Sequence, residues 1–177
     1  ESVRISGNTR NESFSKAKKM AQEVFAGHQK TFYCGCSYEG NVVDLESCGY
    51  KIKKNVKRAK RVEWEHVVPA HAFGQALPEW HDGHPECVDS KGRAFKGRNC
   101  ARKMSKEFRL MEADLYNLQP AIGEVNDQRK NFSMAMIPGE KREFGNCDVE
   151  IEDGKIEPRP EIRGDIARTY FYMDAAY

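Results

Sequence analysis

The sequence predicts a single α+β domain that is rich in loops and stapled by disulfide bonds. Three observations predict this class. Apolar residues recur at helical spacing within 13–27, 106–117 and 163–177, and short strand-like runs lie between these segments. Six cysteines are spread over loop-like sequence. The 177 residues fit one domain with a real core, and a charged fraction of 32% indicates that this core is thin.

The first helix is expected to follow a polar lead-in. Residues 1–12 contain turn-forming Gly and Asn residues, so we expect them to be mobile and the domain to occupy 13–177. Ser13 offers an N-cap and Gly27 a stop. The helix is expected to be structural because its apolar residues share one stripe, which consists of Phe14, Ala17, Ala21, Val24 and Phe25.

Short strands are predicted at 31–34 and 42–45, and a basic segment at 50–61 follows them. Seven of the residues in that segment are Lys or Arg, among them Lys57, Arg58 and Arg61. A run of charges commonly forms a solvated helix or loop face. The alternative is a patch that binds phosphates, because the run leads directly into the next strand.

A strand with two adjacent titratable residues is predicted at 62–68 and is stopped by Pro69. Side chains of a regular strand alternate between its faces, so Glu65 and His66 would point apart. If both serve one site, the strand must end, bulge or bend at His66. Otherwise Glu65 is a solvated residue and His66 a hydrogen-bonded core histidine.

A helical turn is expected at 70–75, and residues 78–104 are expected to be irregular because Gly and Pro interrupt every period. A loop of this length is usually functional or disordered. It is strongly basic, and Lys96, Arg98 and Arg102 are candidates for contacts with backbone phosphates rather than with bases.

The remaining chain is predicted to contain three further elements after the helix at 106–117. Pro120 suits the start of a helix that buries Ile122 and Val125 and places Asn126 near the packed face. A hairpin is expected from 147–151 and 155–157. The last helix, 163–177, is expected to pack through Ile166, Tyr170 and Met173.

Cysteine usage favours three disulfides and an oxidising compartment, because the count is even and no Cys-x-x-Cys pair is present. Sequence proximity pairs Cys87 with Cys100, and Cys48 with either Cys34 or Cys36; Cys147 is the sixth cysteine. Six buried free thiols are the alternative. No apolar run is long enough to span a bilayer. No signal peptide is visible, so an exported protein would already have lost it.

The candidate site residues favour metal-assisted phosphodiester cleavage. A net charge of only +2 means that affinity for nucleic acid must come from local patches. Motifs for a serine nucleophile and for a His-Glu-x-x-His zinc site are absent, since His66 and His71 are one residue too far apart. A carboxylate and an amide oxygen suit Mg²⁺ better than Zn²⁺. Together with a histidine base and arginines, they form a set that cleaves phosphodiesters.

Several long motifs resemble the endonuclease I family of periplasmic or secreted bacterial nucleases, which belong to the ββα-metal (His-Me finger) group. They are the segments 61–71 and 108–126, with further matches at 31–36, 47–50 and 166–173. The resemblance implies a ββα-metal core over about 61–131 within the loop-rich domain. It also implies a further segment with two more cysteines past the last helix, whereas this chain ends at Tyr177.

The resemblance also implies a role for each matching residue. His66 corresponds to the general base, and Glu65 and Asn126 to the protein ligands of one Mg²⁺, a site that Mn²⁺ or Ca²⁺ can also occupy. Glu112 corresponds to a further acidic residue of the active site. An arginine of the basic loop is expected to hold the scissile phosphate, with Arg98 the first candidate and Arg93 and Arg102 the alternatives.

The expected activity is hydrolysis of DNA and RNA by a monomeric, periplasmic or secreted endonuclease with little sequence preference. It would leave 5′-phosphate and 3′-hydroxyl ends. One alternative is a secreted, disulfide-stapled protein that binds nucleic acid without cleaving it. Another is a zinc-dependent hydrolase. A binding protein would not need Glu65, His66 and Asn126, and metal content would identify a zinc enzyme.

Overall fold

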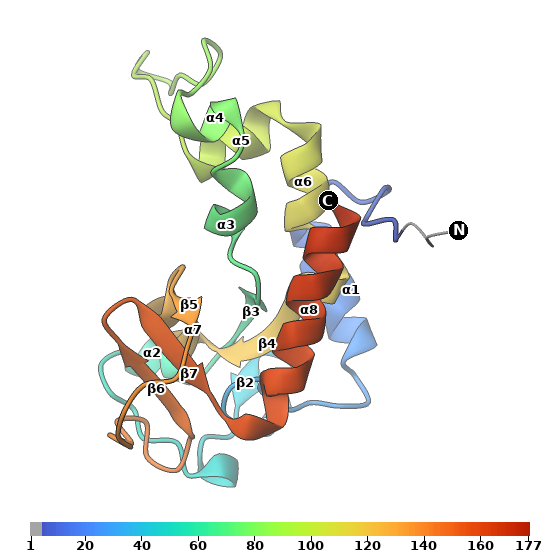
Figure 1. Ribbon diagram of the computed structural model, residues 1–177. Helices are drawn as coiled ribbons and strands as arrows, with labels where there is room; N and C mark the ends of the chain where they lie inside the picture. Colours follow the sequence, from blue (N-terminus) through green and yellow to red (C-terminus); the bar gives the residue numbers. More distant parts are fainter. Residues whose placement is uncertain (1–4) are drawn as a thin grey trace.

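The computed structural model describes residues 5–177 as two regions on either side of one antiparallel strand pair, with the first and last helices running alongside (Figure 1). One region carries the small sheets and the other carries short helices. In chain order the helices and strands are α1 (Phe14–Val24), β1 (Tyr38–Glu39), β2 (Val42–Val43), α2 (Val56–Ala59), β3 (Val62–His66), α3 (Ala70–Gly74), α4 (Pro78–His81), α5 (Arg98–Met104), α6 (Lys106–Glu112), β4 (Leu118–Ile122), α7 (Gly123–Arg129), β5 (Ser133–Met134), β6 (Val149–Glu152), β7 (Lys155–Pro158) and α8 (Arg163–Ala176).

The central unit is the β3–β4 pair followed by α7. Strand β3 runs antiparallel to β4, with Val62 opposite Ile122 and His66 opposite Leu118. Pro120 therefore lies within a strand opposite Trp64, and the predicted helix begins three residues later, at Gly123. Proline has no backbone N–H to donate. Pro120 is nevertheless compatible with this strand, because β3 and β4 form a two-stranded sheet in which the missing N–H can lie on the outer, unpaired edge.

Strand β3 ends at His66. An end, a bulge or a bend at this residue was the condition for Glu65 and His66 to serve one site, and the structure meets it with an end. Beyond it the backbone is held by Asn117. The N–H of Val67 donates to the carbonyl of Asn117, and the side chain of Asn117 bonds both the N–H and the carbonyl of Val68. The strand is thus shorter than the expected 62–68, because at Val68 the side chain of Asn117 takes the place of a backbone hydrogen-bond partner.

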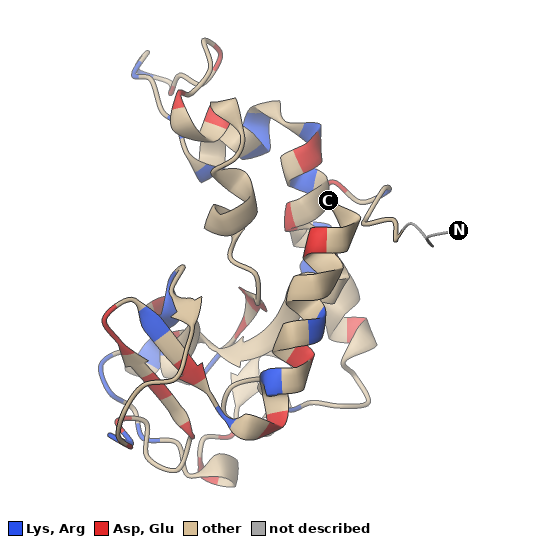
Figure 2. Cartoon of the chain, in the orientation of Figure 1, with Lys and Arg blue, Asp and Glu red and all other residues tan. Residues whose placement is uncertain are grey.

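The segment between β3 and β4 forms the helical region, and it is more ordered than expected. Residues 78–104 were predicted to be irregular, yet α4 and α5 lie within them and a Cys87–Cys100 disulfide joins their connection to α5. The charged residues of α5 are all lysine or arginine, α6 carries both signs, and the charged residues of β6 are all acidic (Figure 2). Helix α6 stops at Glu112, earlier than the expected residue 117, and a 3₁₀ turn covers Leu115–Asn117.

The other predicted elements are partly confirmed. The hairpin of β6 and β7 is present, and β5 adds to β7 in parallel. The strand expected at 31–34 is a turn, because Gly35 has a φ of 68° and its N–H donates to the carbonyl of Thr31. The mobile lead-in is also corrected in part. Residues 1–4 lie outside the described region, but the side chain of Asn8 donates to the carbonyl of Leu110, and Glu12 pairs with Arg109.

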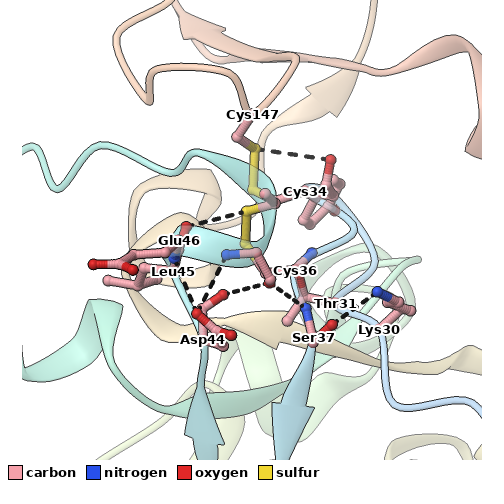
Figure 3. The surroundings of a disulfide bond; sticks show 12 residues. Lys30, Thr31, Cys34, Cys36, Ser37, Asp44, Leu45, Glu46 and Cys147 are labelled. Atoms are coloured by element: carbon pink, nitrogen blue, oxygen red, sulfur yellow. Dashed lines mark hydrogen bonds between the residues drawn. A yellow bond between two sulfur atoms is a disulfide. The ribbon is translucent and has the colours of Figure 1, made fainter.

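All six cysteines form disulfides, as the cysteine count predicted. Cys87 pairs with Cys100, and Cys36 is the partner of Cys48. Cys34 instead reaches Cys147, 113 residues away, next to the Cys36–Cys48 bridge (Figure 3). The Cys34–Cys147 and Cys36–Cys48 bridges belong to the main core, where Tyr33, Val67, Phe144 and Ile156 are fully buried.

Candidate active site

One cavity of about 1110 Å³ gathers most of the predicted site residues. Strand β3 contributes Glu65 and His66, α7 contributes Asn126, and α5 contributes Arg98. Arg58 and Arg61, from the basic segment, also line it. Lys57, Lys96, Arg102 and Glu112 are not among its lining residues, so the predicted substrate-binding set is brought together only in part.

Glu65 is a buried carboxylate held by two partners. Its Oε1 accepts a hydrogen bond from the Tyr33 hydroxyl at 2.7 Å and pairs with the Arg129 guanidinium at 2.5 Å. Burial raises the pKa of Glu65, whereas the charge of Arg129 and the hydroxyl of Tyr33 lower it. Both partners use the same oxygen, which leaves Oε2 for a ligand.

Arg129 is fully buried and fixes the end of β3 as well as Glu65. Its guanidinium donates to the carbonyls of His66 and Val67, at 2.7 and 2.8 Å, and to that of Phe132 at 3.1 Å. A buried arginine is expensive unless its donors are paired, so this geometry holds strand and helix in one arrangement. Sequence reasoning missed Arg129, although it lies one helical turn after Asn126.

His66 packs between aromatic rings and one backbone carbonyl. Its ring lies 4.9 Å from the ring of Phe14, and its Nε2 lies 2.8 Å from the carbonyl oxygen of Glu112. Because a carbonyl only accepts, Nε2 carries the proton and Nδ1 is the basic nitrogen. Burial, followed by the charge of Arg98, lowers the pKa of His66 to about 4, so the ring is neutral at pH 7.

Glu112 organises two arginines from outside the cavity. Arg98 Nε and Arg102 Nη2 lie 2.7 and 2.6 Å from its Oε1. Burial alone would raise the pKa of Glu112, but the hydrogen bonds and charges of Arg102 and Arg98 keep it below the ordinary value. Glu112 therefore aims Arg98 at the cavity while Arg102 stays beside the carboxylate.

Glu63 is a site residue that the sequence reasoning missed. It lies two residues before Glu65, and alternation along β3 places both on one face. Its carboxylate accepts from Arg58, Arg61 and Asn126, the last at 2.9 Å. Although burial acts in the opposite direction, these bonds lower the pKa of Glu63. The amide nitrogen of Asn126 is thereby occupied, and its oxygen is left for a ligand.

The donor atoms at this cavity fit a hard cation with several water ligands. Glu65 Oε2 and the amide oxygen of Asn126 are both oxygen donors. Among residues 5–177, the one group of three close carboxylate, imidazole or thiol ligands lies elsewhere, at Glu140, Asp148 and Glu150. Mg²⁺ commonly binds through one or two protein oxygens and keeps water or phosphate in its other positions. The residues present thus fit Mg²⁺.

The first helix contributes a basic wall that was expected to be only structural. Lys18, Lys19 and Gln22 line the cavity together with Phe14. Lys18 Nζ also lies 5.0 Å from the ring centre of Phe14, which packs against His66. Lys130, just past α7, adds another cation. The spacing of these lysines on α1 could have indicated a second, polar use of that helix.

Comparison with known proteins agrees with the motifs. A family model described as Endonuclease I matches residues 7–177. An extracellular deoxyribonuclease of Aeromonas hydrophila is 41% identical over 173 residues, which cover 94% of this chain and 69% of that protein. A periplasmic deoxyribonuclease of the same organism is 39% identical, with coverage of 94% and 67%. Endonuclease-1 of Buchnera aphidicola from Acyrthosiphon pisum is 38% identical, with coverage of 94% and 63%. The chain thus spans about two thirds of the length of these relatives.

Proposed function

The chain belongs to the endonuclease I family, and on this premise we propose that it is a Mg²⁺-dependent endonuclease with a ββα-metal site that cleaves DNA and RNA. The observation that carries the proposal is the meeting of Glu65, His66 and Asn126 on one cavity lined by arginines and lysines. The names of the relatives support DNA as a substrate.

His66 acts as the general base in this proposal. Its protonated Nε2 is anchored to the carbonyl of Glu112, so Nδ1 is free to take a proton from water. The low pKa keeps that nitrogen unprotonated at neutral pH. Phe14 and Phe73 flank the ring and restrict its rotation.

Glu65 and Asn126 would hold the metal, and Arg98 would hold a phosphate oxygen. When bound, Mg²⁺ would neutralise the negative charge that develops on the phosphate and on the leaving oxygen. In-line attack by water with a 3′-oxygen leaving group gives 5′-phosphate and 3′-hydroxyl ends. The cations contact the phosphate backbone, so cleavage shows little sequence preference.

Three disulfides and the extracellular and periplasmic names of relatives support action outside the cytoplasm. We further propose that the enzyme acts as a monomer. No helix among residues 5–177 has the length and apolarity needed to cross a membrane.

The test is plasmid nicking with Mg²⁺ and with EDTA, using the wild type, His66→Ala and His71→Ala. His71 lines the same cavity but is exposed, so it serves as the matched control. We expect EDTA to abolish nicking and His66→Ala to lower the rate by about 10²–10⁴-fold, the usual contribution of a general base. His71→Ala should remain active, and fluorescence anisotropy should show that His66→Ala still binds DNA.

Wild-type-like cleavage by His66→Ala would show that His66 is not the base. Binding without cleavage by the wild type in any divalent metal would favour a non-catalytic binding protein.

A further inference from the structure

A second cluster of oxygen ligands lies away from the cavity, around the connection between β5 and β6. Carboxylate oxygens of Glu140, Asp148 and Glu150 lie within 4.8 Å of one another. Glu140 comes from the connecting loop, Asp148 directly precedes β6, and Glu150 lies on β6. None of the three lines the candidate active site.

Glu150 is the residue that makes this cluster unusual. Its side chain is only 5% exposed, and its Oε1 is buried with no hydrogen-bond partner among residues 5–177. A buried carboxylate oxygen without a partner is costly, so it calls for a cation or a proton. Burial raises the pKa of Glu150, and the charges of Glu140 and Asp148 raise it further.

Nearby basic residues compensate the cluster incompletely. Arg142 reaches Glu140 at 3.1 Å and Asp148 at 2.9 Å, but Glu150 is not among its partners. The Arg142 side chain is 43% exposed and can swing into solvent. Lys141 pairs with Glu152 instead. On the facing strand, Glu157 opposes Glu150 and is already paired with Arg163.

We propose that Glu140, Asp148 and Glu150 form a structural Ca²⁺ site, separate from the nuclease centre. All the donors are oxygen atoms, which excludes the soft ligand sets of zinc and copper. Ca²⁺ accepts six to eight oxygens in irregular geometry, whereas Mg²⁺ requires a near-ideal octahedron, and three carboxylates from a loop and a strand suit the former.

Binding would replace Arg142 at the cluster and give Glu150 the partner that it lacks. It would also fix the loop next to the Cys34–Cys147 bridge, because Asp148 follows Cys147 directly. The inference does not rest on the proposed nuclease activity, since no residue of the cluster reaches the cavity.

The experiment measures the thermal midpoint of EDTA-treated protein with and without about 10 mM Ca²⁺, and binding by calorimetry. Extracellular Ca²⁺ sites have dissociation constants of about 10⁻⁴–10⁻³ M. Near 100 times the dissociation constant, we expect the Tm of the wild type to rise by about 5–10 °C. Mg²⁺ at the same concentration should raise it less.

Variants assign the effect to the cluster. Glu150→Gln and Glu140→Gln should each lose the rise, whereas Glu107→Gln, which removes an exposed carboxylate elsewhere, should keep it. Asn126→Ala, which alters the cavity, should also keep it. Glu150→Gln should retain Mg²⁺-dependent cleavage, so failure of this site is distinguishable from failure of the nuclease.

The proposal is overturned if Ca²⁺ leaves the wild type unchanged, because Glu150 would then carry a proton. It is also overturned if the rise persists in Glu140→Gln, or disappears in Asn126→Ala while persisting in Glu150→Gln. If Glu150→Gln does not fold, the response of Glu140→Gln to Ca²⁺ decides between the outcomes, because Glu140 is exposed and its replacement should not disturb the fold.

Discussion

At the residue scale, the most consequential contact is the hydrogen bond from Tyr33 to Glu65. The hydroxyl donates to the same carboxylate oxygen as Arg129, so neither partner occupies Oε2 of Glu65, a residue that lines the cavity. Partners of metal ligands commonly set ligand orientation, and their loss lowers metal affinity or activity by about 10–100-fold. On the proposal that Glu65 holds the metal, Tyr33 acts through Glu65 as a positioning residue.

Tyr33→Phe should therefore raise the Mg²⁺ concentration needed for half-maximal cleavage by about tenfold. Tyr50→Phe is the matched control, because the Tyr50 hydroxyl donates to Glu124 at the same distance, 2.7 Å. Each variant should lose about 1.5–3 kcal/mol of stability with its bond to a charged group. Only Tyr33→Phe should shift the Mg²⁺ activation curve. An equal shift in Tyr50→Phe would show that Tyr33 stabilises the fold and does not position Glu65.

Single residues also show how far the sequence could be interpreted. Glu65, His66 and Asn126 were identified from motifs that are local in the chain, and they line one cavity. Arg129, Tyr33 and Glu63 were not, because their importance depends on which buried group they meet. Cys147 was left without a partner for the same reason, since proximity in sequence does not indicate a bridge over 113 residues.

At the element scale, α1 has two faces with different tasks. Ala17 and Ala21 are buried against the core, whereas Lys18 and Lys19 line the cavity. A phosphate backbone bound there would release counterions from each lysine contact, and binding would depend on salt accordingly.

Replacing both Lys18 and Lys19 by Ala should weaken DNA binding and reduce the slope of log K against log salt by about 2. Binding isotherms at several NaCl concentrations measure this slope. Lys16→Ala is the control, because Lys16 lies on the same helix but does not line the cavity. If the double variant kept the wild-type slope, α1 would lie outside the DNA interface.

The misassigned elements have a common physical cause. Pro120 suits the first turn of a helix, yet pairing with β3 places it in a strand, so tertiary contacts override local preference. The short helices α4 and α5 were hidden because Gly and Pro surround them. In contrast, α8 and the β6–β7 hairpin are present where they were predicted. Ile166 and Met173 are buried as expected, but Tyr170, the third residue of the predicted packed face, is 37% exposed.

At the scale of the whole molecule, the Cys34–Cys147 bridge ties the N-terminal turn region to the last sheet. It closes 113 residues, whereas Cys87–Cys100 closes 13. In the chain-entropy description, a longer loop restricts the unfolded chain more.

Removing Cys34–Cys147 as a double Ala variant should therefore cost about 2 kcal/mol more than removing Cys87–Cys100 in the same way. Urea denaturation of the two variants measures the difference. A larger loss from the shorter bridge would show that native packing around Cys100, rather than chain entropy, dominates.

The helical region inserted between β3 and β4 has a practical consequence. Its tip, the connection 82–97 between α4 and α5, projects away from the paired strands, and no residue of this connection lines the cavity (Figure 1). Exposed tips of this kind accept added sequence because little buried backbone depends on them. The turn at Gly92 is thus a natural attachment point, where a fluorophore or surface tether would label the protein without obstructing its substrate.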